Sequence, residues 1–275
     1  MKTFNNVQSL AVINWRQVLP TLLTLAAMLS GFLSILMTFE GIRTGDVEFF
    51  SWAARLIMLA MILDGMDGNL ARLLRGTSEF GAELDTYVDM TAFGLAPALL
   101  IFAVTLQSKD PFWRVLLPSA VAMSGVVRLA RFKVRDPARG QAGYTGLPIT
   151  ANAAWVALFV FISLTPPRDQ FSLEHGPVAT LFLVGILVFV VLQVTNLRYP
   201  KPTKHLSLFV PCVVLVALLW CLQARLAARV AALMIALGTA YVVLGPLFVK
   251  GMAAHKARRQ AAEDHDANNG VVNEE

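Results

Sequence analysis

The sequence predicts an all-α integral membrane protein with about eight transmembrane helices and with both termini in the cytoplasm. Hydrophobic residues make up 56% of the 275 residues and charged residues only 15%, whereas a soluble domain of this size needs far more polar surface. The apolar residues gather in runs of about 20, the length with which an α-helix crosses the hydrocarbon core. The net charge of +5 is spread over membrane flanks with no recognition fold beside it, so we expect anionic headgroups and phosphates as partners and no nucleic acid.

Eight apolar runs define the predicted spans. They cover residues 18–39, 51–74, 83–106, 113–132, 147–164, 178–194, 207–222 and 226–249. Residues 17–250 therefore form one membrane domain. Residues 1–16 are an N-terminal cytoplasmic segment whose weak apolar face is compatible with a short interfacial helix. Residues 251–275 lack an apolar pattern, and we expect them to be a disordered cytoplasmic tail.

The lysines and arginines predict the orientation of these spans. With the N-terminus inside, the cytoplasmic loops and both ends carry 16 of the 23 basic residues. The positive-inside rule then places both termini, and the loop between the second and third spans, in the cytoplasm. We accordingly expect a multi-pass protein of the cell membrane whose polar site faces the cytoplasm.

That loop joins two pairs of acidic residues within the stretch DGMDGNLARLLRGTSEFGAELDTYVD, residues 64–89. Asp64 and Asp67 are three apart on one predicted helix and Asp85 and Asp89 are four apart on the next, so each pair shares a helix face. The short loop makes the helices antiparallel and brings the four carboxylates together. Inserting an Asp at the centre of a membrane helix costs ~2.5 to 3.5 kcal/mol of free energy, so four such acids need compensating positive charge. Oxygen ligands in this number suit one or two magnesium or manganese ions, whose charge would balance the cluster.

Small residues surround the same acids and remove side-chain bulk from the region. They are Gly65, Gly68, Ala71, Gly76 and Gly81. Arg72, one turn after Gly68, can reach a phosphate at the membrane edge as a bidentate donor. Metals, an arginine and an accessible backbone together describe a diphosphate site, although glycines also mark close helix packing and intramembrane acids also mark ion or proton pathways.

The spacing of these residues resembles that of the CDP-alcohol phosphotransferases. Their pattern DxxDGxxARx8GxxxDxxxD is matched without a departure by Asp64, Asp67, Gly68, Ala71, Arg72, Gly81, Asp85 and Asp89. Members of this family are membrane enzymes that move a phosphatidyl or similar group from a CDP-linked donor to an alcohol and release CMP. The resemblance implies a homodimer as well, because homodimers are common in the family.

The resemblance also implies roles for individual residues. Asp64, Asp67, Asp85 and Asp89 would hold two divalent metal ions, Mg²⁺ or Mn²⁺, and Asp89 would also be the general base. The residues that would line the CDP-diacylglycerol site are Gly68, Ala71, Arg72, Ser78 and Gly81.

Further segments narrow the acceptor alcohol. DMTAFGLAPALL, VVRLARFKV, GLPIT and NLRYPKPTK look like segments of the membrane-embedded bacterial phosphatidylserine synthases, which implies L-serine as the acceptor and membrane phospholipid biosynthesis as the role. Thr21 departs from that pattern, in which asparagine is more usual. Arg128, Arg131 and Lys133 are candidates to bind the serine carboxylate, with Arg131 preferred, although a positive-inside cluster is the commoner explanation for any one of them.

Two alternatives stay open from the sequence. The first is the same transfer to glycerol 3-phosphate or inositol phosphate, since a phosphorylated acceptor would also use basic residues. The second is a divalent-cation transporter that uses the four acids as its ion site.

Overall fold

The computed structural model describes residues 15–105, 110–135, 144–165, 173, 176–200 and 206–272. Its elements, in chain order, are α1 (Trp15–Thr44), α2 (Glu48–Leu73), α3 (Glu79–Val88), η1 (Asp89–Leu95), α4 (Ala96–Thr105), α5 (Pro111–Arg135), β1 (Tyr144–Thr145), α6 (Ile149–Ser163), α7 (Gly176–Val194), β2 (Arg198–Tyr199), α8 (Leu206–Cys221) and α9 (Ala224–Val272). The predicted all-α architecture is confirmed, apart from one two-residue antiparallel strand pair.

Six of the described helical stretches are long and apolar enough to cross a membrane, which supports a multi-pass membrane protein. They are Trp15–Thr44, Glu48–Leu73, Glu79–Thr105, Pro111–Val134, Gly176–Val194 and Arg225–Val249. The other two expected spans correspond to shorter apolar helices, Ile149–Ser163 and Val210–Cys221. The total of eight crossings and the side on which each terminus lies stay predictions.

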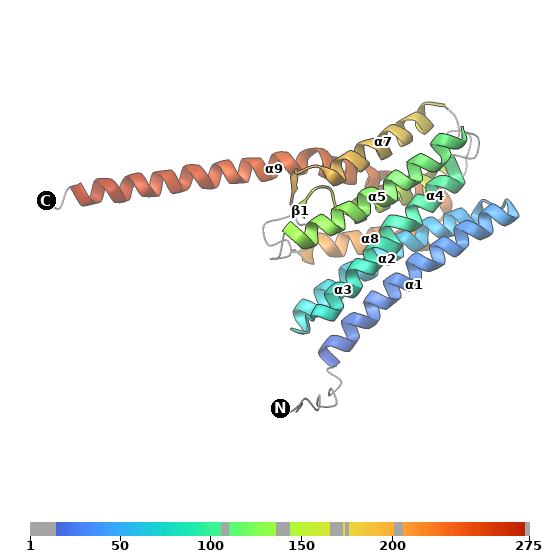
Figure 1. The fold of residues 1–275 in the computed structure, drawn as a ribbon, viewed down its shortest axis with the longest axis horizontal. Coiled ribbons are helices and arrows are strands. Elements are labelled where there is room, and N and C mark those ends of the chain that lie inside the picture. The colour runs from blue at the N-terminus through green and yellow to red at the C-terminus, as the bar shows by residue number, and fades with distance from the viewer. Residues whose placement is uncertain are drawn as a thin grey trace, which may run out of the picture.

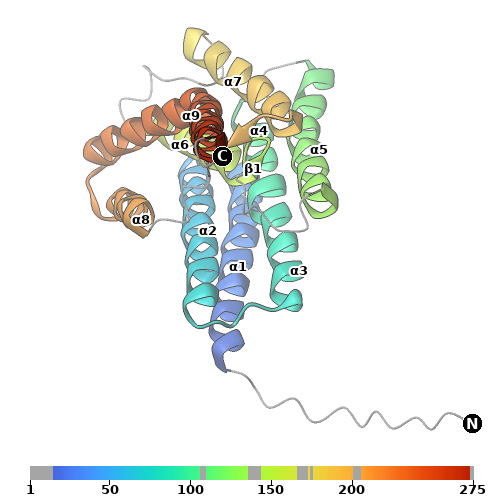
Figure 2. The ribbon, with the colours of Figure 1, turned by 90° about the vertical axis from the view of Figure 1, so that its left-hand side faces the viewer.

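The helices α1, α2 and α3 lie side by side (Figures 1 and 2) and form the frame of the polar region. The face of α1 toward α2 carries small residues, which lets the two backbones approach closely. Two hydroxyls on that face bond across the pair: Ser30 Oγ donates to the Leu56 carbonyl at 2.8 Å, and Ser34 Oγ donates to the Ala53 carbonyl at 2.9 Å. These bonds hold the first half of α2 against α1.

The third span contains a π-helical segment, η1, between α3 and α4. The Ala96 N–H donates to the Thr91 carbonyl, an i to i−5 bond. Pro97 directly follows; it has no N–H to give to the carbonyl four residues earlier, and its ring crowds that carbonyl. The proline thus explains why the helix widens just after Asp89.

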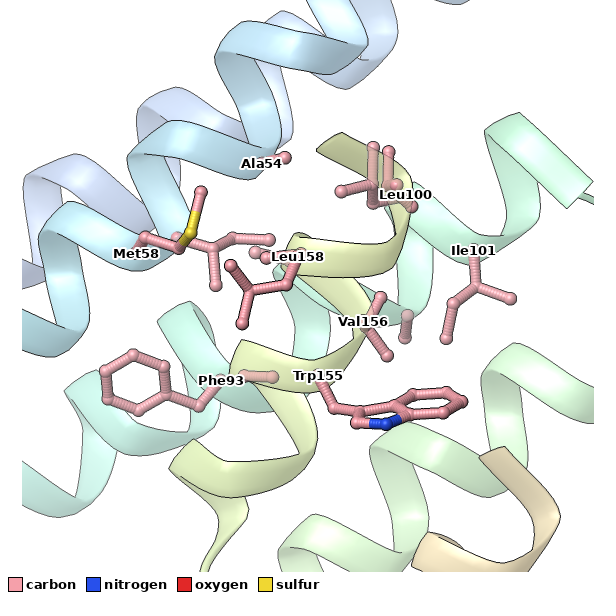
Figure 3. Packing of buried hydrophobic residues seen from close by; sticks show 14 of the residues in the cluster. Ala54, Met58, Phe93, Leu100, Ile101, Trp155, Val156 and Leu158 are labelled. Carbon is pink, nitrogen blue, oxygen red and sulfur yellow. The ribbon is translucent and has the colours of Figure 1, made fainter. Parts of the chain in front are cut away.

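The central helix of the apolar core is α6, which contacts α2, η1, α4, α7 and α9. Figure 3 shows Trp155, Val156 and Leu158 of α6 pointing among side chains of its neighbours, including Met58 and Phe93. Because α6 is apolar on every side, it carries no amphipathic stripe and is enclosed by other helices. This enclosure explains how a helix of only 15 residues is accommodated.

In the described backbone α9 runs on to Val272, and the expectation of a disordered tail over residues 251–275 stays a prediction. Figure 1 shows α9 extending far from the remaining helices. The segment GMAAHKARRQAAE is rich in strong helix formers, and continuity with a membrane helix removes the cost of starting a new helix. The predicted interfacial helix within residues 1–16 lies almost entirely outside the described residues, since α1 begins at Trp15.

Candidate functional site

Three of the four predicted acids form a carboxylate cluster between α2 and α3. One carboxylate oxygen from each of Asp64, Asp67 and Asp85 lies within 4.8 Å of the others. At 1.5 Å per residue, Asp67 and Asp64 lie about 9 and 14 Å from the last residue of α2, Leu73, measured along the helix. The i, i+3 spacing on α2 and the antiparallel approach of α3 thus produce the predicted convergence.

Asp89 stands beside this cluster, at the junction of α3 and η1. Its carboxylate is repelled electrostatically by Asp85, Asp64 and Asp67, and it is attracted by the guanidinium of Arg128 on α5. Arg128 is buried, with 6% of its surface exposed. Asp89 therefore lies between the acidic cluster and a buried cation that arrives from another helix.

A cavity of about 350 Å³ opens next to the cluster, between the start of α1, the end of α2 and the start of α3. All five residues predicted to line the donor site are in its wall: Gly68, Ala71, Arg72, Ser78 and Gly81. Asp67 and Asp85 also belong to the wall. The acids and the small residues, which we expected from the sequence to form one diphosphate site, therefore lie around one cavity.

The backbone of α2 is open to this cavity at Gly68. A Cβ added to Gly68 would meet no protein atom within 4 Å, so the glycine leaves free space rather than packing against a neighbouring helix. Arg72, one turn later, is exposed, and its Nη2 donates to Asn69 Oδ1 at 2.8 Å. The exposed guanidinium thus stands at the end of α2 beside an unobstructed stretch of helix.

The opposite wall of the cavity is the N-terminus of α3. Ser78 is the N-cap residue, and its Oγ accepts the Gly81 N–H at 3.0 Å. The accepting oxygen still leaves the hydroxyl proton available for a ligand. Helix N-termini favour phosphate groups through their free N–H groups and their dipole. Ser78 and Gly81 therefore have a structural role in starting α3 and also face the space where an anion would bind.

The loop between α2 and α3 is packed tightly against the start of α1. A Cβ on Gly76 would lie 1.9 Å from the Arg16 carbonyl oxygen. Arg75, the residue before it, adopts a left-handed conformation with φ of 52°. Gly76 is thus needed for the close approach of loop and helix that closes one side of the cavity.

Sequence reasoning missed Thr24 on α1. This residue is 5% exposed, lines the cavity, and has its Oγ1 at 2.5 Å from Asp67 Oδ2 and at 3.0 Å from the Pro20 carbonyl oxygen. A polar side chain within an otherwise apolar run was the available signal. Thr21, the departure from the family pattern, also lines the cavity and donates its hydroxyl to the Gln17 carbonyl at 2.8 Å.

The three candidate acceptor cations occupy different environments. Arg131, which we preferred, donates to the carbonyls of Gln193, Val194 and Thr195 at the end of α7. Lys133 forms an exposed ion pair with Glu83 on α3 at 2.5 Å. These contacts give Arg131 and Lys133 structural functions, whereas Arg128 is the cation whose charge acts on Asp89.

The donor set fits a divalent metal ion. Carboxylate oxygens are the ligands that magnesium and manganese prefer, and Asp64 Oδ1 is buried without a hydrogen-bond partner. Such a buried acceptor is costly unless a cation or donor satisfies it. Among the described residues, this cluster is the group of acids, histidines and cysteines close enough to share an ion.

Comparison with known proteins agrees with this geometry. The model of the CDP-alcohol phosphatidyltransferase family matches residues 17–244. The CDP-diacylglycerol--serine O-phosphatidyltransferase of Helicobacter pylori is 31% identical over 213 residues, which cover 76% of this chain and 84% of the relative. The Saccharomyces cerevisiae protein of the same name is 31% identical over 193 residues, covering 63% and 67%. An archaetidylserine synthase of Methanothermobacter thermautotrophicus is 29% identical over 185 residues, covering 66% and 70%.

Proposed function

Because the chain belongs to the CDP-alcohol phosphatidyltransferase family, we propose that it transfers the phosphatidyl group of CDP-diacylglycerol to the hydroxyl of L-serine. The products are phosphatidylserine and CMP. The observation that carries this proposal is one cavity whose wall contains two of the clustered acids together with all five residues that the family resemblance assigns to the donor site. The names of the relatives from Helicobacter pylori and Saccharomyces cerevisiae support serine as the acceptor.

The donor diphosphate would enter between α2 and α3. Arg72 would bind a phosphate oxygen with two N–H groups. Ser78 and the N-terminal N–H groups of α3 would bind the other side of the diphosphate. Gly68 and Ala71 would allow the nucleotide to approach the α2 backbone. The diacylglycerol tails would remain in lipid, so the donor need not leave the bilayer.

Asp64, Asp67, Asp85 and Asp89 would hold two divalent ions, Mg²⁺ or Mn²⁺. Bound there, the ions would neutralise charge on the diphosphate and on the leaving CMP. Thr24 would hold Asp67 in place through the hydroxyl contact, as outer partners of metal ligands commonly do. This arrangement explains why an acidic cluster lies within two apolar helices.

Asp89 would act as the general base. The serine oxygen attacks the phosphorus that carries diacylglycerol, the bond from that phosphorus to the CMP oxygen breaks, and the hydroxyl proton passes to Asp89. The surrounding helices position both reactants, which is the main requirement for phosphoryl transfer. Arg128 would bind the serine carboxylate, because it is buried and close enough for its charge to act on Asp89.

The proposal places the cavity on the cytoplasmic side of the cell membrane, as the distribution of basic residues predicts. The nucleotide and serine would then arrive from the cytoplasm. The proposal also includes a homodimer, on the family resemblance alone, and cross-linking in native membranes tests it. A monomer that retains full activity would contradict that part.

The decisive experiment measures CMP release by purified protein in detergent, with CDP-diacylglycerol and Mg²⁺ or Mn²⁺. L-serine is compared with glycerol 3-phosphate, inositol phosphate and no acceptor. We expect release that depends on serine and on metal and that is lost in Asp89→Asn. CMP release with another acceptor would support the proposed phosphatidyl transfer and contradict serine as the acceptor. Absence of release with every acceptor, together with metal flux in protein-containing liposomes, would favour a cation transporter.

Arg128 is tested separately with a matched control. Arg128→Gln should raise the KM for serine by about tenfold or more, because a charge-assisted contact to the carboxylate is lost. The KM for CDP-diacylglycerol should stay unchanged. Lys133→Gln removes a nearby exposed cation and should leave both constants unchanged. Equal effects of the two substitutions on serine would contradict the assignment, provided that both variants unfold at the wild-type temperature.

A further inference from the structure

A second cavity system lies between α6, α7 and α9, away from the acidic cluster. One cavity of about 400 Å³ is lined by α6, α7 and α9 residues, and a smaller one of about 110 Å³ follows it along α6 and α9. Ile235 of α9 belongs to both walls. Residues of α6 line both cavities as well, so the two adjoin along α6 and α9, and we call them together the α6–α9 groove.

Small residues on one face of α9 create this groove. Ala228, Ala232 and Gly238 follow each other at helical spacing in its wall, with Ile235 between them. A Cβ on Gly238 would meet no atom within 4 Å. The facing residues of α6, such as Phe159, are apolar. Within a membrane, an apolar space of this kind loses packing energy unless hydrocarbon fills it.

The length of the groove matches a lipid tail. The wall on α9 extends from Ala228 to Val242, which is about 21 Å at 1.5 Å per residue. Half of the hydrocarbon core of a bilayer is about 15 Å thick. An extended acyl chain from one leaflet therefore fits along the groove from its mouth past the middle of the membrane.

A cation stands where the headgroup of such a lipid would be. Arg229 lines the larger cavity, is exposed, and lies about 8 Å from the first residue of α9. Its long side chain can bring the guanidinium to the interface while its methylenes stay in the apolar region. Within the described part of the chain, Arg229 forms no ion pair with an acid. A phosphate has the charge and geometry to fill that role.

We propose that the α6–α9 groove binds an anionic glycerophospholipid, with one acyl chain along α9 and its phosphate on Arg229. This site is separate from the donor cavity. Arg229 lies near the start of α9, at the end of the helix bundle where α6 ends and α7 begins. The donor cavity lies where α1 begins and α2 ends. The bound lipid belongs to the opposite leaflet from the donor and would act as a fixed component that joins α9 to α6 and α7. The proposal does not depend on the transfer reaction.

Native mass spectrometry of the full chain tests this site with phosphatidylglycerol as the probe and phosphatidylcholine as the uncharged comparison. Wild-type protein should retain phosphatidylglycerol preferentially. Arg229→Gln should reduce retention by up to about fivefold, the effect of losing one exposed ion pair. Arg225→Gln is the matched control, because Arg225 is an exposed cation one turn earlier that does not line either cavity; it should leave retention unchanged.

The acyl part is tested by filling the groove. Ala232→Phe should abolish preferential retention of phosphatidylglycerol, and Ala232→Leu provides a smaller filling variant if the phenylalanine variant does not fold. Equal retention by wild type and the filling variant would overturn the groove as the site. Equal losses in Arg229→Gln and Arg225→Gln would overturn the headgroup assignment. Conversion of a dimer to monomer by Ala232→Phe without loss of lipid would identify a second copy of the chain as the occupant instead.

Discussion

Gly68→Ala separates ligand binding from protein packing more sharply than any other substitution in the donor cavity. The added methyl group would extend into the cavity, where no protein atom lies within 4 Å. Alanine in a helix interior is favoured over glycine by about 1 kcal/mol. The variant should therefore unfold at the wild-type temperature or slightly above it, while the space available to the donor decreases.

The expected effect on the donor follows from steric overlap. Forcing an extra methyl group into a close contact costs about 1 to 3 kcal/mol, which corresponds to a rise of about fivefold to 150-fold in the KM for CDP-diacylglycerol. The assay is CMP release at varied donor concentration, beside thermal unfolding in the same detergent. The serine KM should not change, because the methyl group lies on the donor side.

A control isolates the effect of helix propensity. Gly251→Ala also adds a Cβ that meets no atom within 4 Å, on α9 and outside the donor cavity, and it should leave both KM values unchanged. An unchanged donor KM in Gly68→Ala would refute the inference that the donor approaches α2 here. A fall in unfolding temperature with the loss of activity would refute the claim that the space is free.

Three other substitutions test the supporting structure. Thr24→Val removes the hydroxyl beside Asp67 and should raise the half-activating Mn²⁺ concentration about tenfold, whereas Thr24→Ser should retain wild-type activation. Equal Mn²⁺ activation curves for wild type and Thr24→Val would exclude the positioning role of Thr24. Arg131→Gln should lower the free energy of unfolding by on the order of 2 kcal/mol, because hydrogen bonds from a charged donor to the end of α7 are lost. A rise in the serine KM without loss of stability would instead show that Arg131 binds serine. Gly31→Ala places a Cβ 2.5 Å from Ala92 Cβ and should destabilise the α1–η1 contact by ~1 to 3 kcal/mol, measured as a lower unfolding temperature; an unchanged temperature would show that the helices can separate freely.

The spacing of residues along the sequence predicted those features that lie within a single helix. Asp64 and Asp67 share a face because of their i, i+3 separation, and the predicted span 51–74 differs from α2 (Glu48–Leu73) by a few residues. The short connection to α3 also made the approach of Asp85 predictable. These features follow from helix geometry and from the length of the apolar run.

Contacts between distant segments were beyond such reasoning. Thr24 and Asp67 are 43 residues apart, and nothing in either local pattern indicates that they meet. Arg128 and Arg131 lie one turn apart on α5, so composition cannot distinguish them; the end of α7, more than 60 residues later, binds one of them. The helical end of α9 was not predicted, because we considered its apolar pattern and not its intrinsic helix propensity.

The π-helical segment gives the third span a fixed angular offset between its two halves. Each residue of an α-helix advances the side chains by about 100°, so a wider turn shifts every later side chain relative to Asp85 and Asp89. Phe93 and Gly94 are buried in this segment, and the Cβ of Gly94 would lie 3.7 Å from Ile149 of α6. Deleting one residue between Asp89 and Pro97 would permit a regular helix and at the same time turn α4 away from its partners. The length of this segment is therefore as restrictive for the protein as the identity of its acids.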